Sequence, residues 1–218
     1  MNVQVCGKRA FGYLPGAAFL KLQGRLGGLG GTMSCNLAIA VCGIICGVTL
    51  ARSLGPIGRG EMAAALLWPG VLVLLGDLGL GFAFSFYAGT QPEEIGTLWT
   101  LTVLIGSGVG AILATLGSFL LPILLSALTP TACAGMRIGL LSVPLILVSG
   151  YQAYLLLGAG WIADYNAVKL IASIAYAVSL PSLALCGARN VSSYAAAFVL
   201  SQTLGLLAAA GEGTILAG

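Results

Sequence analysis

The fold is decided by the stretch LARSLGPIGRGEMAAALLWPGVLVLLGDLGLGFAFSFY, at residues 50–87. Its polar part, residues 52–61, contains two arginines and one glutamate and separates two long apolar segments. Four helix-breaking residues lie in that part: Gly55, Pro56, Gly58 and Gly60. They predict a tight loop. The stretch therefore predicts a hairpin of two membrane-spanning helices joined by a charged turn.

The composition places the chain among polytopic membrane proteins. Apolar residues make up 59% of the sequence, charged residues make up 7%, and the mean hydropathy is +1.05. A soluble domain averages about 25% charged residues, so this chain could not cover a water-facing surface. Its apolar runs are continuous over about 20 residues, whereas barrel strands alternate polar and apolar positions over about ten. We therefore expect an all-α integral membrane protein surrounded by membrane lipid.

Several function classes are excluded by what the sequence lacks. The net charge of +3 is small and no basic run resembles a phosphate-reading patch, so nucleic acid is not an expected partner. Histidine is absent, and neither G-x-S-x-G nor G-x-x-x-x-G-K occurs. We expect no enzyme activity, no catalytic residue, no metal and no cofactor.

Three of the six cysteines share one face of a helix, because Cys35, Cys42 and Cys46 are spaced i, i+7 and i+11. A metal site would need further Cys or His ligands at a matching spacing. Cysteine also packs as a small apolar residue between helices. Packing is the favoured interpretation, with a metal or redox role as the alternative.

Six apolar segments are expected to span the membrane, at about 32–52, 60–88, 93–125, 136–157, 163–185 and 191–210. Residues 1–31 form a basic, glycine-rich tail, either an interfacial segment or an extension from an upstream start codon. Residues 211–218 are expected to be the cut end of a longer chain.

Both termini are expected on the same side of the membrane, since the number of spans is even. The expected inner segments carry five basic residues and the outer loops carry four, which favours a cytoplasmic location for both ends. The inner set is Lys8, Arg9, Lys21, Arg25 and Lys169, and the outer set is Arg52, Arg59, Arg137 and Arg189.

Prolines and paired glycines predict where the helices bend and touch. Pro69-Gly70 and Pro144 are expected to kink their helices. Gly43 with Gly47, and Gly106 with Gly110, form G-x-x-x-G pairs, and each pair predicts a close helix–helix approach.

Three motifs resemble one family. ARSLGPIGRGE at 51–61, DLGL at 77–80 and YQAYLLLGAGWIADYN at 151–166 are similar, in order and spacing, to bacterial polysaccharide and O-antigen flippases. These are MATE-like exporters of the MOP superfamily, and the resemblance covers about residues 32–210. The chain departs from the pattern in supplying one six-helix lobe where relatives carry two, and in an acidic loop at Glu93 and Glu94 that is commonly basic in relatives.

The resemblance implies a fold and a function. Two six-helix lobes would enclose a hydrophilic cavity and flip an undecaprenyl-diphosphate-linked oligosaccharide across the bacterial inner membrane, driven in several members by H⁺ or Na⁺. The missing second lobe would come from the rest of a longer chain or from a second copy. A MATE-like small-molecule antiporter and a non-transporting membrane scaffold for glycosyltransferases remain alternatives.

Asp77 is the most informative single residue, because a charge at the centre of a membrane helix costs about 2.5–3.5 kcal/mol. One hypothesis makes it an ion-coupling carboxylate or a counter-ion for a cation in the cavity. The other makes it a packing residue, hydrogen-bonded to a nearby Ser, Thr or Tyr, since Gly76, Gly79 and Gly81 signal close contact.

Five further polar residues are candidates for the substrate pathway: Arg52, Tyr151, Gln152, Tyr154 and Gln202. Arg52 could bind the diphosphate or reach the lipid headgroups. Tyr151, Gln152 and Tyr154 suit sugars but also suit an interfacial aromatic belt, as do Tyr165 and Asn166. Gln202 could line the cavity or bridge two helices.

Overall fold

The computed structural model describes residues 28–124, 130–188 and 190–216, and these residues contain helices and no strand. The elements are α2 (Leu29–Asp77), α3 (Leu80–Thr90), the 3₁₀ helix η1 (Pro92–Glu94), α4 (Ile95–Leu124), α5 (Pro130–Leu140), α6 (Ser142–Gly158), α7 (Ile162–Leu185) and α8 (Val191–Leu216). The all-α prediction is confirmed for this part of the chain.

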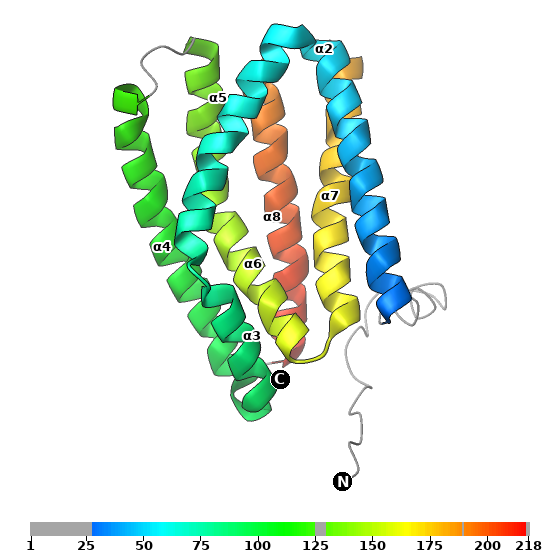
Figure 1. The fold of residues 1–218 in the computed structure, drawn as a ribbon, viewed down its shortest axis with the longest axis vertical. Coiled ribbons are helices and arrows are strands. Elements are labelled where there is room, and N and C mark those ends of the chain that lie inside the picture. The colour runs from blue at the N-terminus through cyan, green and yellow to red at the C-terminus, as the bar shows by residue number, and fades with distance from the viewer. Residues whose placement is uncertain (1–27, 125–129, 189, 217–218) are drawn as a thin grey trace.

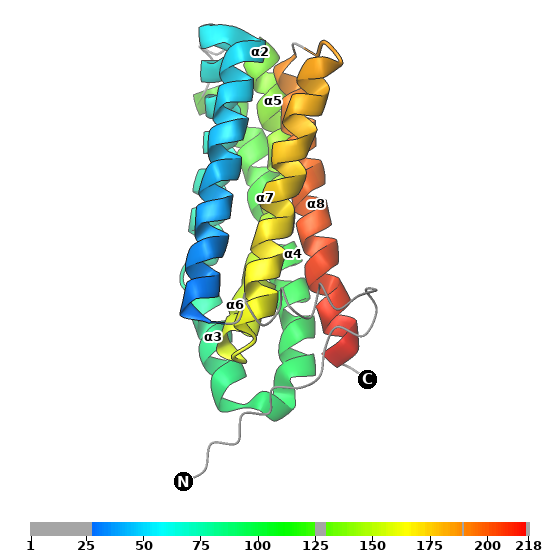
Figure 2. The same cartoon turned by 90° about the vertical axis from the view of Figure 1, so that its right-hand side faces the viewer.

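The helices form an up-and-down bundle whose long axes are roughly parallel (Figure 1). The chain rises and descends within α2, descends further through α3, rises in α4, descends through α5 and α6, rises in α7 and descends in α8. The beginning of α2 and the end of α8 lie at the same end of the bundle, and the view in Figure 2 agrees. The side of the membrane that these two helix ends face stays a prediction.

Within residues 28–124, 130–188 and 190–216, five helical segments are long and apolar enough to cross a membrane. Large apolar side chains are exposed along their length, with Leu74 at 74% and Phe119 at 71% of full exposure. Such a surface is compatible with lipid and would be unstable in water. The chain is therefore a membrane-embedded protein.

The hairpin turn in α2 is sharper than the sequence predicts. Helical geometry continues through the expected loop at 52–61, and Gly55 alone departs from it, with φ 68° and ψ −174°. That region of backbone space is essentially restricted to glycine. One residue therefore reverses the chain, and the predicted loop is wrong.

The second apolar segment, expected as one helix at 60–88 with a kink at Pro69-Gly70, breaks elsewhere. The backbone stays helical through Pro69 and leaves helical geometry at Leu78 and Gly79, with φ values of 36° and 85°. The result is two helices, α2 ending at Asp77 and α3 beginning at Leu80. The break occurs where the sequence reads GDLGLG, rather than at the proline.

The helix expected at 136–157 begins at Pro130 and is interrupted at Leu141. Pro144 explains the interruption, because proline has no N–H to donate to the carbonyl of Leu140 and its ring crowds that carbonyl. The Leu141 N–H instead donates to the Ile138 carbonyl at 3.1 Å, one residue short of the α-helical spacing. The predicted kink at Pro144 therefore occurs, three residues before the proline.

The remaining helix ends differ from the expectations by a few residues. α2 begins at Leu29, inside the expected tail, and α8 continues to Leu216, inside the segment expected at 211–218. α4 and α7 begin at Ile95 and Ile162, close to the expected 93 and 163. Residues 1–27 of the expected tail lie outside the described residues.

Candidate functional site: the cleft at Asp77

Two side-chain hydrogen bonds hold the break between α2 and α3. The Tyr151 hydroxyl donates to the Gly76 carbonyl at 2.9 Å, and the Gly81 N–H donates to Asp77 Oδ1 at 3.3 Å. A helix end leaves carbonyls without intrahelical partners, and a helix start leaves N–H groups without them. Tyr151 therefore satisfies the end of α2, and Asp77 satisfies the start of α3.

A cleft of about 320 Å³ lies beside this break, between the second half of α2 and α6. Its lining residues are Gly70, Val73, Leu74, Asp77, Ile146, Leu147, Gly150, Tyr151 and Tyr154. Most of the wall is apolar, and its polar groups are one carboxylate and two phenols. A concave, largely apolar wall with few polar groups is the usual composition of a small-ligand site.

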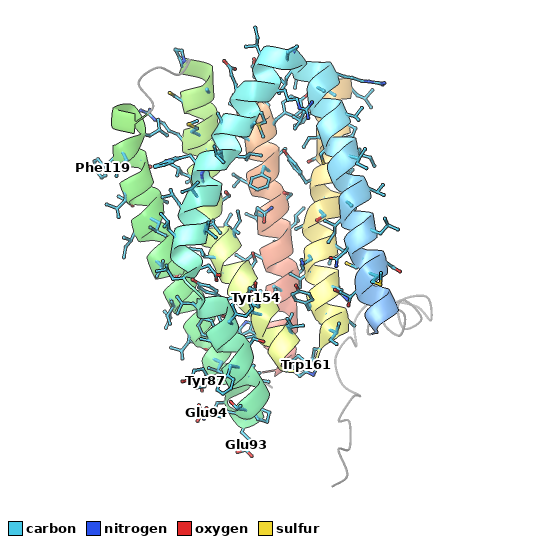
Figure 3. All side chains as sticks on the ribbon, viewed as in Figure 1. Tyr87, Glu93, Glu94, Phe119, Tyr154 and Trp161 are labelled. Atoms are coloured by element: carbon cyan, nitrogen blue, oxygen red, sulfur yellow. The ribbon has the colours of Figure 1, made fainter. Side chains whose placement is uncertain are left out.

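Asp77 and Tyr154 converge on the same glycine. A Cβ atom added to Gly81 would lie 3.2 Å from Asp77 Oδ1 and 2.5 Å from Tyr154 Cδ2, so no larger residue fits between them without displacement. Tyr154 also packs against Phe82, with ring centroids 5.4 Å apart. Figure 3 shows Tyr154 where α3 and α6 lie together.

Tyr151 is fixed more firmly than Tyr154. Its side chain is 1% exposed, and its ring packs against Phe84 with centroids 5.3 Å apart. Together with the bond to Gly76, this contact holds the Tyr151 hydroxyl at the break. Tyr154 is half-buried, so its ring is the more accessible of the two.

The charge in the cleft is negative. Among the residues that line it, Asp77 is the single ionisable carboxylate, and none is a lysine or arginine. Its one hydrogen bond in the described residues comes from a neutral backbone N–H. A carboxylate beside aromatic rings and an apolar wall attracts cations and repels phosphates.

Asp77 does not lie at the centre of a helix, as the sequence interpretation assumed. It is the last residue of α2, 22 residues after the turn at Gly55. At 1.5 Å per residue this segment is about 33 Å long, which matches one hydrocarbon thickness of about 30 Å. Asp77 therefore lies one membrane thickness from the turn. Its partner is a backbone N–H rather than a Ser, Thr or Tyr side chain.

The structure brings together three of the six candidate residues, Asp77, Tyr151 and Tyr154. Arg52 is exposed beside the Gly55 turn, at the other end of the bundle. Gln202 is half-buried on α8 and does not line the cleft.

Gln152 is buried outside the cleft. It is 1% exposed, and its Oε1 atom accepts no hydrogen bond from the described residues. It follows Val148 by four positions on α6, one turn further along the helix face that packs on α4. The hypothesis that it belongs to one site with Tyr151 is therefore not supported by the lining of the cleft.

A second polar cluster joins the first turns of α2 and α7. Asn166 Nδ2 donates to Thr32 Oγ1 at 3.0 Å, and the Cys35 thiol donates to the Asn166 carbonyl at 3.3 Å. Lys169 Nζ donates to the Tyr165 hydroxyl at 3.2 Å and lies over that ring. Tyr165 and Asn166 therefore bind their neighbours here instead of joining the Asp77 cleft.

The three cysteines of α2 pack within the bundle. Cys35 and Cys46 are 2% and 7% exposed, and Cys42 packs against the main apolar core. Among the described residues no three His, Cys, Asp or Glu side chains are arranged to hold a metal ion.

Sequence reasoning missed the break itself and the aromatic partners Phe82 and Phe84. The alternation of glycine with Asp77 in GDLGLG was the available signal, because glycines permit both left-handed backbone and close approach. That Tyr151 closes the break from α6, 75 residues away, requires the tertiary structure.

Comparisons with known proteins identify no relative of this chain. No family model, no curated protein and no solved structure matches the chain.

Proposed function

We propose that the chain is the N-terminal lobe of a MATE-type exporter that flips undecaprenyl-diphosphate-linked oligosaccharide across the bacterial inner membrane, with both termini cytoplasmic. The observation that supports it most is the meeting of two motifs. Asp77 comes from the motif at 77–80 and Tyr151 and Tyr154 come from the motif at 151–166, and all three line one cleft. The family resemblance and the geometry thus point to the same residues.

In this proposal the cleft binds the driving cation, H⁺ or Na⁺. Its lone carboxylate suits a cation, and the absence of lysine and arginine from its lining disfavours a diphosphate there. The diphosphate would instead meet cations at the end of the bundle where Arg52 is exposed. The other wall of the substrate path would come from a second lobe or a second copy.

The test is gradient-driven export by the complete transporter in proteoliposomes, with lipid-linked oligosaccharide as cargo. Asp77→Asn keeps the size of the side chain and its capacity to accept the Gly81 hydrogen bond, but removes the charge. We expect it to reduce gradient-driven export at least tenfold. The matched control is Glu93→Gln, because Glu93 is an exposed acid on η1, remote from Tyr154 (Figure 3), and its loss should leave export unchanged. Full export by Asp77→Asn would overturn the coupling role.

A second function is favoured by the same cleft. A carboxylate beside Tyr154 and an apolar wall also fits an organic cation, through ion pairing and cation–π contact. In that case the protein would be an ion-coupled small-molecule antiporter. Uptake of a labelled lipophilic cation, with no movement of lipid-linked oligosaccharide, would select this alternative.

A scaffold for glycosyltransferases needs no transport pathway. Polymer assembly that persists when Asp77, Tyr151 and Tyr154 are all replaced would favour the scaffold over both transporters.

A further inference from the structure

The break between α2 and α3 carries backbone strain. Leu78 has φ 36° and ψ 26°, a left-handed conformation that costs residues with a Cβ atom, and it is the one non-glycine residue with positive φ among those described. Gly79 follows with φ 85° and ψ 4°. Leu78 is 82% exposed, so contacts with neighbouring side chains do little to hold it in this conformation.

The two hydrogen bonds at the break each satisfy one backbone group that a continuous helix would pair within itself. In an unbroken helix the Leu80 N–H would donate to the Gly76 carbonyl, and the Gly81 N–H would donate to the Asp77 carbonyl. In the structure the Gly76 carbonyl accepts from Tyr151, and the Gly81 N–H donates to the Asp77 side chain. The same two backbone groups are therefore satisfied in either arrangement.

We infer that the α2–α3 junction is a two-state hinge. In the bent state Tyr151 and Asp77 hold the break. In the straight state the helix satisfies its own backbone and releases the Asp77 carboxylate and the Tyr151 hydroxyl toward the cleft.

Opposing terms balance the two states. The strained Leu78 favours the straight state, and the packing of α3 on α6 favours the bent state. That packing is close, since the Ser85 carbonyl lies against Gly158, and Phe84 and Ala88 are buried. Because lipid tails are as apolar as these side chains, uncovering them costs far less in a membrane than in water.

The hinge links the cleft to the position of α3. A ligand that binds the released carboxylate, or accepts a hydrogen bond from the released hydroxyl, binds the straight state better and increases its population. A ligand competes with the Gly81 N–H for the Asp77 carboxylate, and in the straight state the helix backbone removes that competitor. Occupancy of the cleft would in this way move an 11-residue helix.

The test measures the position of α3 directly, so it does not depend on transport. Spin labels are introduced as noncanonical amino acids at Thr90, at the end of α3, and at Ser107, on α4, in the full chain in lipid nanodiscs. Both positions are exposed, and the native cysteines remain. Gly79→Ala disfavours the bent state, because a Cβ atom there meets no neighbour but occupies a left-handed position. We expect the ratio of straight to bent distances to rise about fivefold or more.

Two further variants fix the interpretation. Gly160→Ala is the matched control, since Gly160 has φ 80° and open space around its Cβ position but lies in the turn between α6 and α7. It should leave the distance distribution unchanged. Leu78→Gly relieves the strain and should shift the population toward the bent state.

Tyr151→Phe removes one bond of the bent state and should shift the population the same way as Gly79→Ala, which keeps the test valid if Gly79→Ala fails to fold. A single distance distribution, identical in wild type, Leu78→Gly and Tyr151→Phe, would overturn the hinge. No export of lipid-linked oligosaccharide by the wild-type transporter, together with an intact hinge response, would instead count against the proposed function alone.

Discussion

The two G-x-x-x-G pairs of this chain have the same sequence pattern and opposite surroundings. Gly106 and Gly110 on α4 are buried against α6, where added Cβ atoms would overlap Val148 and Pro144. Around Gly43 and Gly47, in the first half of α2, a Cβ atom would meet nothing within 4 Å. One pair forms a helix contact, and the other faces away from its neighbours.

The difference shows what a glycine pair can and cannot specify. Small residues allow two backbones to approach, but in lipid no hydrophobic force selects the approaching helix. The pair on α4 is used because Pro144 interrupts the partner helix, and its ring and backbone fit against Gly110. No described helix presents such a surface to Gly43, so the predicted close approach does not occur within the described residues.

Gly110→Ala should have the largest effect on this comparison. The added methyl group would overlap the backbone of Pro144, which cannot move aside as a flexible side chain could. Overpacking of this kind costs about 1–3 kcal/mol, and we expect the upper end of that range. Denaturant unfolding in detergent measures it.

Gly108→Ala is the matched control for Gly110→Ala, because it lies on the same helix with nothing within 4 Å of its Cβ position. A Gly110→Ala variant as stable as Gly108→Ala would show that α4 and α6 do not pack at this point.

Gly106→Ala should have an intermediate effect. Its Cβ atom would lie 2.8 Å from Val148 Cγ2 and 3.0 Å from Val148 Cα, so part of the conflict involves a side chain. We expect a loss of about 1–2 kcal/mol. The double variant with Val148→Ala should recover part of it, measured by the same unfolding experiment as a double-mutant cycle. Strict additivity would mean that Gly106 and Val148 do not meet.

Gly43→Ala with Gly47→Ala should have the smallest effect. Alanine is favoured over glycine in helices, so the stability of the lobe should stay constant or rise by up to about 1 kcal/mol per site. A clear loss of stability in the same unfolding experiment would contradict the open surroundings of this pair.

The sequence predicts several spans and the interruption before Pro144, but it misplaces the interruptions in the first two apolar segments. Continuous apolar runs are sufficient to locate α4 and α7, because lipid requires long helices that satisfy their own backbone. Pro69 and Pro144 have the same local signal, yet the α-helix continues through Pro69 and is interrupted at Leu141, where the N–H bonds three residues back instead of four. The helices packed around each proline decide between the two outcomes, and single-residue propensity carries no such information.

The candidate site was predictable in part. Asp77 was identifiable as a lone carboxylate in an apolar run, and Tyr151 and Tyr154 as polar residues near a helix end. The meeting of these three residues in one cleft was not predictable, because it depends on a left-handed conformation at Leu78 that leucine rarely adopts. Gln152 shows that neighbours in sequence need not share a site. Successive residues of a helix point to different faces, so Gln152 lies on another face of α6 than Tyr151.

The single-residue reversal at Gly55 also bears on how the polypeptide enters a bilayer. The two halves of α2 share almost no connecting segment, so a translocation machinery would have to accept them together, as one folded pair. Arg52 and Arg59 are exposed near the apex of that pair. If both termini are cytoplasmic, as we propose, both guanidinium groups cross the hydrocarbon core during synthesis, at about 2.5–3.5 kcal/mol each at its centre. Transfer of the long apolar segments on either side from water into the bilayer supplies the free energy that carries the turn across the membrane.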